Sequence, residues 1–357
     1  MRTYIIAEIG VNHNGSLQIA KKLIDMAKKA KVDAVKFQSF VTEEVITKSL
    51  EKARYQKEMT GEHESQFDMV KKLELSFSDF VELKKYCDSK NIEFISSPFD
   101  IESLQNLLDL GLKRIKIASG EITNAPLLLE IGRTSLPTIL STGMSTLGDI
   151  EKALGVLAFG YLNMDQDPTE ENFERAYLES EGIEILKDKV CLLHCTTEYP
   201  APFNQINLKA LDTLKKAFML PTGLSDHSPG IITPIAAVAR GAKIIEKHFT
   251  LDKNMPGPDH KASLDPLELE EMVESIRIVE DLIGNPQKVP NISELQNRSL
   301  VRRSLVARKK INIGELFTSE NIAIKRPGTG ISPFKYWKYL GKKSLHNYSE
   351  DEQINFD

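Results

Sequence analysis

The amino-acid sequence predicts a (β/α)8 barrel followed by a small β-rich domain. Eight short apolar runs alternate with amphipathic helical stretches over residues 1–284, and units of this length fit a parallel barrel better than an open sheet. Beyond residue 297 the pattern changes to short strands and tight turns. We therefore expect a barrel domain at 1–284, a linker at 285–297 and a compact domain at 298–357. A doubly wound open sheet is the alternative architecture for the first domain.

The predicted strands are runs rich in β-branched residues, each closed by polar side chains. They cover residues 4–10, 33–40, 92–99, 114–122, 137–144, 190–200, 219–228 and 242–250. Helical periodicity separates most of them. It is clearest in residues 16–31, where Leu23 and Ile24 share an apolar face, and in residues 265–284 after the last strand.

Two segments depart from this alternation. Residues 162–189 are strongly acidic and interrupt the fifth β/α unit, which indicates a solvated surface insertion with some helix. Residues 285–297, "NPQKVPNISELQN", read as a linker. The tail that follows contains an "NIG" turn and an "RPGTG" loop between short strands, as expected of a compact β-rich module.

Composition excludes several classes of partner. The 46 Lys and Arg residues are outnumbered by 51 Asp and Glu, giving a net charge of -5, so no electrostatic footprint for nucleic acid or an anionic membrane is present. The chain starts directly with a strand-like run, and no apolar stretch is long enough to span a bilayer. Its three cysteines follow no pattern. We expect a cytoplasmic protein.

Polar residues gather at the ends of the predicted strands, which in a parallel barrel open at one face, where active sites lie. Two of them are lysines inside apolar strands, Lys36 in "AVKFQ" and Lys116 in "IKIAS". A buried ammonium group without a partner is costly, so each needs an acidic side chain or an anionic ligand. Two such lysines on different strands, with several hydroxyl groups nearby, favour a phosphate or carboxylate site.

Two histidines end neighbouring strands: His227 closes the seventh and His248 the eighth. Their imidazoles can therefore converge on one point. Imidazole suits Zn, Mn or Fe ions, and two nitrogen ligands with the other positions open are typical of catalytic metal sites. The alternative is a pair of hydrogen-bonded core histidines.

Several long motifs resemble those of the sialic acid synthases. They include "AEIGVNHNGS", "KIASGEITN", "LLHCTTEYPAPF", "IEKHFTLDKNMPGPDH" and "KRPGTGIS", and the resemblance runs in order from residue 5 to about 345. It implies a TIM barrel, a small antifreeze-protein-like (SAF) domain and a domain-swapped homodimer. It also implies condensation of phosphoenolpyruvate with N-acetylmannosamine, or a related 2-acetamido hexose, to a nine-carbon 2-keto acid such as N-acetylneuraminate (sialic acid), with release of phosphate.

The same resemblance implies roles for individual residues. The phosphate and carboxylate of phosphoenolpyruvate would be held by Lys36, Ser97, Lys116, Ser119, Ser141 and Ser225, with Thr197 standing where the family often has Asn. The acceptor sugar would lie near Glu8, Gln38, Tyr199 and Asp259, and Arg326 would reach it from the small domain of the other subunit. The catalytic candidates are Glu121, as the acid/base, and Glu8. His227 and His248 would bind Mn²⁺ or Mg²⁺.

The sequence leaves alternatives open. The acceptor is of either the neuraminate or the legionaminate type, the latter being 2,4-diacetamido-2,4,6-trideoxymannose. A different enzyme class is a Schiff-base aldolase in which Lys36 or Lys116 is the nucleophile. A non-enzymatic carbohydrate- or ice-binding protein is disfavoured because it leaves the polar strand ends of the barrel unexplained.

Overall fold

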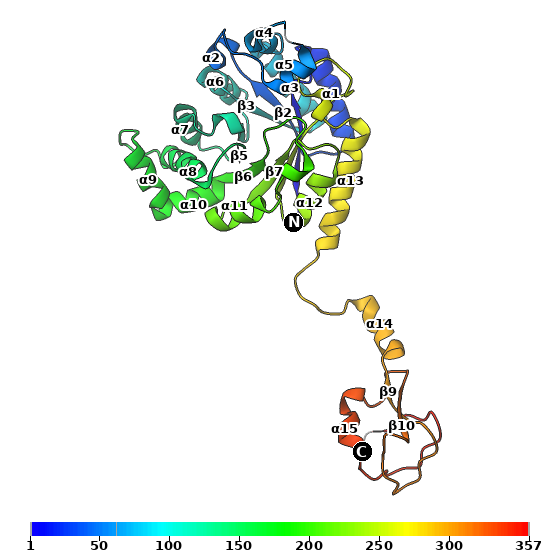
Figure 1. Ribbon diagram of the computed structural model, residues 1–357. Coiled ribbons are helices and arrows are strands. Elements are labelled where there is room, and N and C mark those ends of the chain that lie inside the picture. Colours follow the sequence, from blue (N-terminus) through cyan, green and yellow to red (C-terminus); the bar gives the residue numbers. More distant parts are fainter. Residues whose placement is uncertain (1, 62, 356–357) are drawn as a thin grey trace. The chain divides into compact units, whose positions relative to one another are not determined.

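The computed structural model describes residues 2–61 and 63–355, and the chain divides into two compact units, residues 1–284 and 285–357 (Figure 1). The boundary between the units follows the long helix α13 (Pro266–Ile283). Each unit has its own hydrophobic core.

The first unit contains a nearly closed barrel of eight strands. The strands are β1 (Tyr4–Gly10), β2 (Ala34–Ser39), β3 (Glu93–Pro98), β4 (Ile115–Ile117), β5 (Thr138–Ser141), β6 (Val190–Cys195), β7 (Thr222–Asp226) and β8 (Ile244–His248). Hydrogen-bonded neighbours are parallel and follow the order β3-β2-β1-β8-β7-β6-β5-β4. The end strands β3 and β4 also touch each other. The prediction of a TIM-like barrel is confirmed, and the open-sheet alternative is wrong because β1 pairs with β8.

Helices surround the strands, as Figure 1 shows. The main ones are α1 (Leu17–Lys29), α5 (Phe77–Lys90), α6 (Ile101–Asp109), α7 (Ala125–Arg133), α8 (Leu147–Tyr161), α11 (Ala210–Phe218), α12 (Ile232–Ala239) and α13. Several begin at a polar residue whose side chain accepts a hydrogen bond from the first turn, as Ser16 does for α1 and Asp265 for α13. Such caps satisfy backbone N–H groups that have no partner inside the helix. Short 3-10 turns lie at Ser119–Glu121, Phe203–Gln205 and His260–Ala262.

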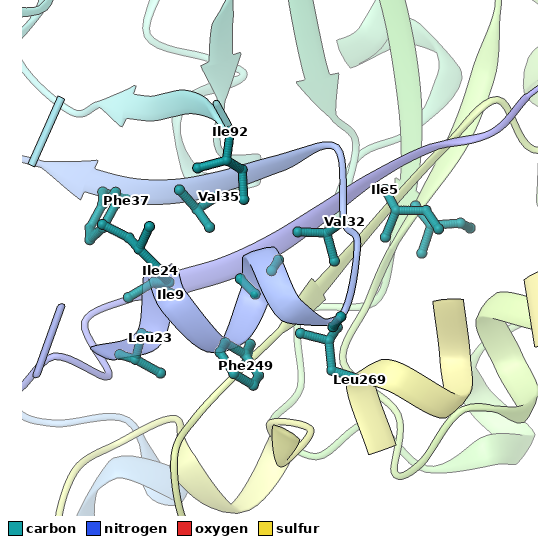
Figure 2. Packing of buried hydrophobic residues seen from close by; sticks show 14 of the residues in the cluster. Ile5, Ile9, Leu23, Ile24, Val32, Val35, Phe37, Ile92, Phe249 and Leu269 are labelled. Atoms are coloured by element: carbon teal, nitrogen blue, oxygen red, sulfur yellow. The ribbon is translucent and has the colours of Figure 1, made fainter. Parts of the chain in front are cut away.

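The hydrophobic core of this unit lies mainly between the strands and the helices. In Figure 2, Ile24 of α1 lies beside Val35 and Phe37 of β2; Leu23 of α1 and Leu269 of α13 belong to the same buried cluster. A second, smaller apolar layer fills the amino-terminal end of the barrel interior. It consists of Ile6, Ala34, Ile95, Ile139, Leu193 and Ile244, one from each of six strands.

Two insertions add short helices to the barrel. Between β2 and α5 lie α2 (Thr42–Val45), α3 (Arg54–Thr60) and α4 (Gln66–Lys71). Between α8 and β6 lie α9 (Glu170–Leu178) and α10 (Ser180–Lys189), in the segment predicted as an acidic insertion. This segment is helical and largely exposed as expected, and it packs on α8 through a few buried residues such as Ala176 and Leu186.

The second unit is small and irregular. It contains α14 (Ile292–Val301), the antiparallel strands β9 (Ser304–Ala307) and β10 (Ile322–Lys325), a 3-10 turn at Pro333–Lys335 and α15 (Tyr336–Tyr339). Single β-bridges, such as Ile311 with Tyr348, supplement the two strands. The exposed helix α14 occupies part of the segment that the sequence suggested to be a linker. Within the described residues of both units, we find no helix with the length and apolar composition needed to cross a bilayer.

Candidate active site

Strand alternation builds a polar layer inside the barrel. Side chains two residues apart on a strand face the same side, so the positions two residues beyond the apolar interior layer also point inward. They are Glu8, Lys36, Ser97, Ser141, Cys195 and Glu246. Lys116 of β4 and Ser225 of β7 complete the layer, because Lys116 Nζ donates to Ser141 Oγ (2.7 Å) and Ser225 Oγ to Glu246 Oε1 (3.2 Å).

Two lysines and two glutamates in this layer form one buried charged cluster. Lys36 Nζ lies 3.0 Å from Glu8 Oε1 and 3.5 Å from Glu246 Oε1, and Lys116 Nζ lies 3.6 Å from the same oxygen of Glu246. All four side chains are at most 5% exposed. The other carboxylate oxygens, Glu8 Oε2 and Glu246 Oε2, are buried without a hydrogen-bond partner among the described residues. The cluster therefore has spare hydrogen-bonding capacity.

The environment shifts the pKa values of this cluster in opposite directions. Burial raises the pKa of Glu8 to about 7, against the opposing effect of Lys36. Burial also lowers the pKa of Lys116, and the charge of Glu246 only partly compensates. For Lys36 and Glu246 the ion pairs outweigh burial, so the pKa of Lys36 is raised and that of Glu246 is lowered. Glu246 is thus the counter-charge that the two ammonium groups share, and Glu8 pairs more closely with Lys36.

The two strand-end histidines lie together beside the charged cluster. The ring centroids of His227 and His248 are 5.2 Å apart, and the Tyr199 ring lies 4.1 Å from that of His227, tilted by 31°. His227 Nδ1 is 2.7 Å from the carbonyl oxygen of Thr196, so this nitrogen donates the hydrogen bond and Nε2 is the ring atom left to face a ligand. His248 Nδ1 is buried without a hydrogen-bond partner among the described residues, and Asp259 Oδ2 lies 3.8 Å away.

This arrangement fits a divalent ion held by two imidazoles. Burial lowers the pKa of His248 well below its usual value, which keeps the ring neutral and able to coordinate, and raises the pKa of Asp259 to about 6. No group of three or more His, Cys, Asp or Glu side chains surrounds a common metal position in the described part of the chain. An ion held by two imidazoles would have its other coordination positions filled by substrate and water, as in catalytic sites.

A cavity of about 410 Å³ opens above the polar layer. Most of the predicted site residues line it: Glu8, Lys36, Gln38, Lys116, Ser119, Ser141, Thr197, Tyr199, Ser225, His227, His248 and Asp259. Gln38 Nε2 donates to Glu8 Oε1 (2.9 Å), and Ser119 Oγ accepts from the backbone N–H of Gly143 (3.0 Å). Predicted site residues from seven of the eight strands, or from the loops that follow them, thus meet in one pocket.

Three predicted residues lie outside the lining of this cavity. Ser97 is fully buried behind Lys36, with its Oγ 3.4 Å from Lys36 Nζ. Glu121 is half-buried and follows Gly120, which lines the cavity; it accepts a hydrogen bond from Asn124 (2.8 Å), and burial raises its pKa. Arg326 is exposed and directly follows β10 in the second unit.

Sequence reasoning missed Glu246 and the wall formed by the first insertion. Glu246 is also a charged residue in a strand, but it opens the polar run "EKH", whereas each lysine stands among apolar neighbours. The insertion contributes Val45, Gln56, Gln66 and Met69 among others to the cavity, although these residues carry no motif. A separate cavity of about 540 Å³ lies among α7, α8 and α9 on the outside of the barrel and contains none of the predicted site residues.

Comparison with known proteins gives a consistent assignment. Residues 23–288 match the NeuB family and residues 302–357 match the SAF domain. An N,N'-diacetyllegionaminic acid synthase of Campylobacter jejuni is 49% identical over 99% of both chains. A synthase of the same name from Legionella pneumophila is 44% identical over 98% of this chain and 92% of its own. The crystal structure of N-acetylneuraminic acid (sialic acid) synthetase from Leptospira borgpetersenii is 34% identical, with a TM-score of 0.67 over 83% of this chain and 90% of that one.

Proposed function

The chain belongs to the NeuB family, whose synthases condense phosphoenolpyruvate with sugars, and we propose that its acceptor is 2,4-diacetamido-2,4,6-trideoxymannose. The product would be N,N'-diacetyllegionaminate. The observation that carries this choice is the near-full-length identity to two synthases of that name, which exceeds the identity to the solved N-acetylneuraminic acid synthetase. The acceptor put first on sequence grounds, N-acetylmannosamine, becomes the competing hypothesis.

The polar layer suits phosphoenolpyruvate. Its phosphate and carboxylate need cationic and hydroxyl donors close together, which Lys36, Lys116, Ser141 and Ser225 offer from four strands. The Lys36 and Lys116 contacts to Glu246 at 3.5 and 3.6 Å are long, so ammonium protons of both lysines can turn from Glu246 to an anion, while Lys36 keeps its 3.0 Å contact with Glu8. We propose that Ser97 orients Lys36 from behind and that Ser119 and Thr197 contact the anion from the rim.

The acceptor would bind on the histidine side of the cavity. A bound Mn²⁺ or Mg²⁺ held by His227 and His248 would supply Lewis-acid polarisation of the aldehyde oxygen. Glu8, Gln38, Tyr199 and Asp259 line the same side and offer hydrogen bonds to the sugar hydroxyl groups. Glu8 is a suitable proton carrier here, because its pKa of about 7 lets it exist in both forms near neutral pH.

The proposed reaction has two stages, formation of a C–C bond and release of phosphate. C3 of phosphoenolpyruvate attacks the aldehyde carbon of the open-chain sugar, forming a C–C bond while the aldehyde oxygen takes up a proton. Water then adds to the electron-poor C2 and loses one proton. As the C–O bond to phosphate breaks, the new C2 hydroxyl group loses its remaining proton, which the departing phosphate takes up, leaving the 2-keto acid and inorganic phosphate. We assign transfer of the water-derived proton to Glu121, whose raised pKa suits an acid/base.

The experiment that tests this function is phosphate release from phosphoenolpyruvate with a panel of acetamido hexoses. We expect kcat/KM for the 2,4-diacetamido-trideoxy sugar to exceed that for N-acetylmannosamine by about 100-fold, since a site built for one set of polar groups rejects the other. Mass spectrometry of the product provides the control. Equal or better use of N-acetylmannosamine would overturn the proposed acceptor and favour N-acetylneuraminate as the product.

A further inference from the structure

One wall of the cavity is built by the first insertion and not by strand ends. Residues 42–73 contribute Val45, Ile46, Met69, Val70 and Leu73, all apolar, to the cavity lining. Met69 and Leu73 are 4% and 8% exposed, so this side of the cavity is a packed surface. It contrasts with the polar layer and the histidines, which lie at the ends of the barrel strands.

Two glutamines are the polar residues that this insertion places in the cavity lining. Gln66 Nε2 donates to Gln56 Oε1 (3.2 Å), and the same oxygen accepts from the backbone N–H of Ala53 (2.9 Å). Within the described residues, no hydrogen bond involves Gln56 Nε2 or Gln66 Oε1. The pair therefore holds one amide donor and one carbonyl acceptor available beside an apolar surface.

Hydrogen bonds and an ion pair within the insertion hold the wall in place. The buried ammonium group of Lys52 contacts Thr60 Oγ1 (2.9 Å), the carbonyl of Gly61 (3.1 Å) and Glu64 Oε1 (3.1 Å). Thr60 Oγ1 in turn donates to the carbonyl of Gln56 (2.8 Å). These contacts close the turn between α3 and α4, so Gln56 and Gln66 belong to a preformed surface.

We propose that this wall determines acceptor specificity by binding the end of the sugar that carries a deoxy methyl group and a second acetamido group. An acetamido group presents one carbonyl acceptor, one N–H donor and a methyl group, which match Gln56 Nε2, Gln66 Oε1 and the apolar side chains. A hydroxymethyl group placed against Val45, Met69 and Val70 leaves its hydroxyl without a partner. The inference rests on the proposed function and names the residues that discriminate between the two acceptors.

The test compares the two acceptors in variants of the wall. Gln66→Leu keeps the side-chain volume and removes the acceptor oxygen, and Gln66 is only partly buried, so the fold is retained. We expect a drop of about 10- to 100-fold in kcat/KM for the diacetamido sugar, with the KM for phosphoenolpyruvate within about twofold of wild type. Val70→Ser should shift the ratio of kcat/KM values toward N-acetylmannosamine by about tenfold. Gln105→Leu, on the exposed side of α6 and outside the cavity, is the matched control.

The kcat/KM values of wild type for the two sugars test the proposed acceptor, and the ratios of these values in the variants test the proposed role of the wall. If wild type does not prefer the diacetamido sugar, the proposed acceptor is wrong and the wall proposal falls with it. If wild type prefers that sugar but both Gln66→Leu and Val70→Ser keep the wild-type ratio and melting temperature, only the wall proposal is wrong. A changed ratio in the Gln105→Leu control as well would overturn the wall proposal, since the effect would not be local.

Discussion

Two sets of buried charges include neighbouring residues of β8, Glu246 and Lys247, and differ in how completely their hydrogen-bonding groups are satisfied. On the outer face of β7 and β8, Lys247 Nζ donates to Asp226 Oδ2 (2.6 Å) and to the carbonyl of Ser228, and both charged side chains are fully buried. Asp226 also accepts from the backbone N–H (3.0 Å) and hydroxyl (3.1 Å) of Ser228. On the inner face, Glu246 reaches its two lysine partners only at 3.5 and 3.6 Å and keeps an unpartnered oxygen.

The difference separates structural from ligand-binding charges. A buried ion pair whose donors and acceptors are all engaged contributes to the fold and has nothing to offer a ligand. In the inner cluster Glu246 has only long contacts to the two lysines, two carboxylate oxygens can still accept a hydrogen bond from a donor, and a cavity adjoins, so a ligand can complete the cluster. We therefore assign Glu246 to ligand binding and its chain neighbour Lys247 to stability of the fold.

The largest effect is expected at the inner histidines. His248→Ala removes a proposed metal ligand, so turnover should fall by about 10³-fold or more, because metal polarisation of a carbonyl contributes several kcal/mol. Exhaustive chelation of the wild type should have the same effect, and Mn²⁺ should restore activity in steady-state assays. His194→Ala is the control, since His194 on β6 lies outside the cavity and bonds the carbonyl of Ile206. Full activity after chelation would contradict the metal assignment.

The next largest effect is expected on stability at the outer pair. Lys247→Met leaves Asp226 buried without its counter-charge, so the free energy of unfolding should fall by about 3–5 kcal/mol. Denaturant unfolding measures this change. The double variant Asp226→Leu/Lys247→Met should recover most of the loss, because apolar residues of similar volume often replace a buried pair without cost. If Lys247→Met has normal stability but binds phosphoenolpyruvate more weakly, the outer pair serves ligand binding and not the fold.

A smaller effect, on catalysis instead of stability, is expected at Lys116. Lys116→Met leaves Glu246 still in contact with Lys36 and Ser225, so the protein should remain folded. The KM for phosphoenolpyruvate should rise by about 10- to 100-fold, the value of a charged hydrogen bond, and the KM for the sugar should change less. Unchanged kinetic constants would make Lys116 a structural residue. Trapping of wild type, but not of Lys116→Met, by borohydride with pyruvate would indicate the Schiff-base mechanism instead.

The barrel and much of the polar layer could be predicted from the sequence because strand alternation and charges inside apolar runs are local signals. Lys36 and Lys116 stand alone in apolar strands and are easily recognised. Glu246 was missed because "EKH" places three polar residues in succession, and only the register of β8 shows which of them point inward. The wall of residues 42–73 depends on how an insertion folds back over the barrel, which is a tertiary property without a local pattern.

The smallest effect is expected at Arg326, which lies in the second unit and in neither buried set. It is exposed in the loop that follows β10, where a solvated surface role is the simplest interpretation. The family resemblance leads us to propose instead that it binds the acetamido oxygen of the sugar from the small domain of a partner subunit in a homodimer. Arg326→Ala should then raise the KM for the sugar by about tenfold, with little change for phosphoenolpyruvate, as lost charged hydrogen bonds do.

Subunit mixing tests whether Arg326 acts in trans. If each site combines one barrel with the other subunit's small domain, a heterodimer of His248→Ala and Arg326→Ala has one doubly damaged site and one intact site. Activity at low sugar concentration should therefore rise toward half of wild type per heterodimer, although both parents are impaired. If Arg326 acts within its own subunit, each heterodimer has one site of each parental kind and no rescue occurs. Mass spectrometry of differently tagged subunits verifies the exchange, and exchange without rescue rules out the contribution in trans.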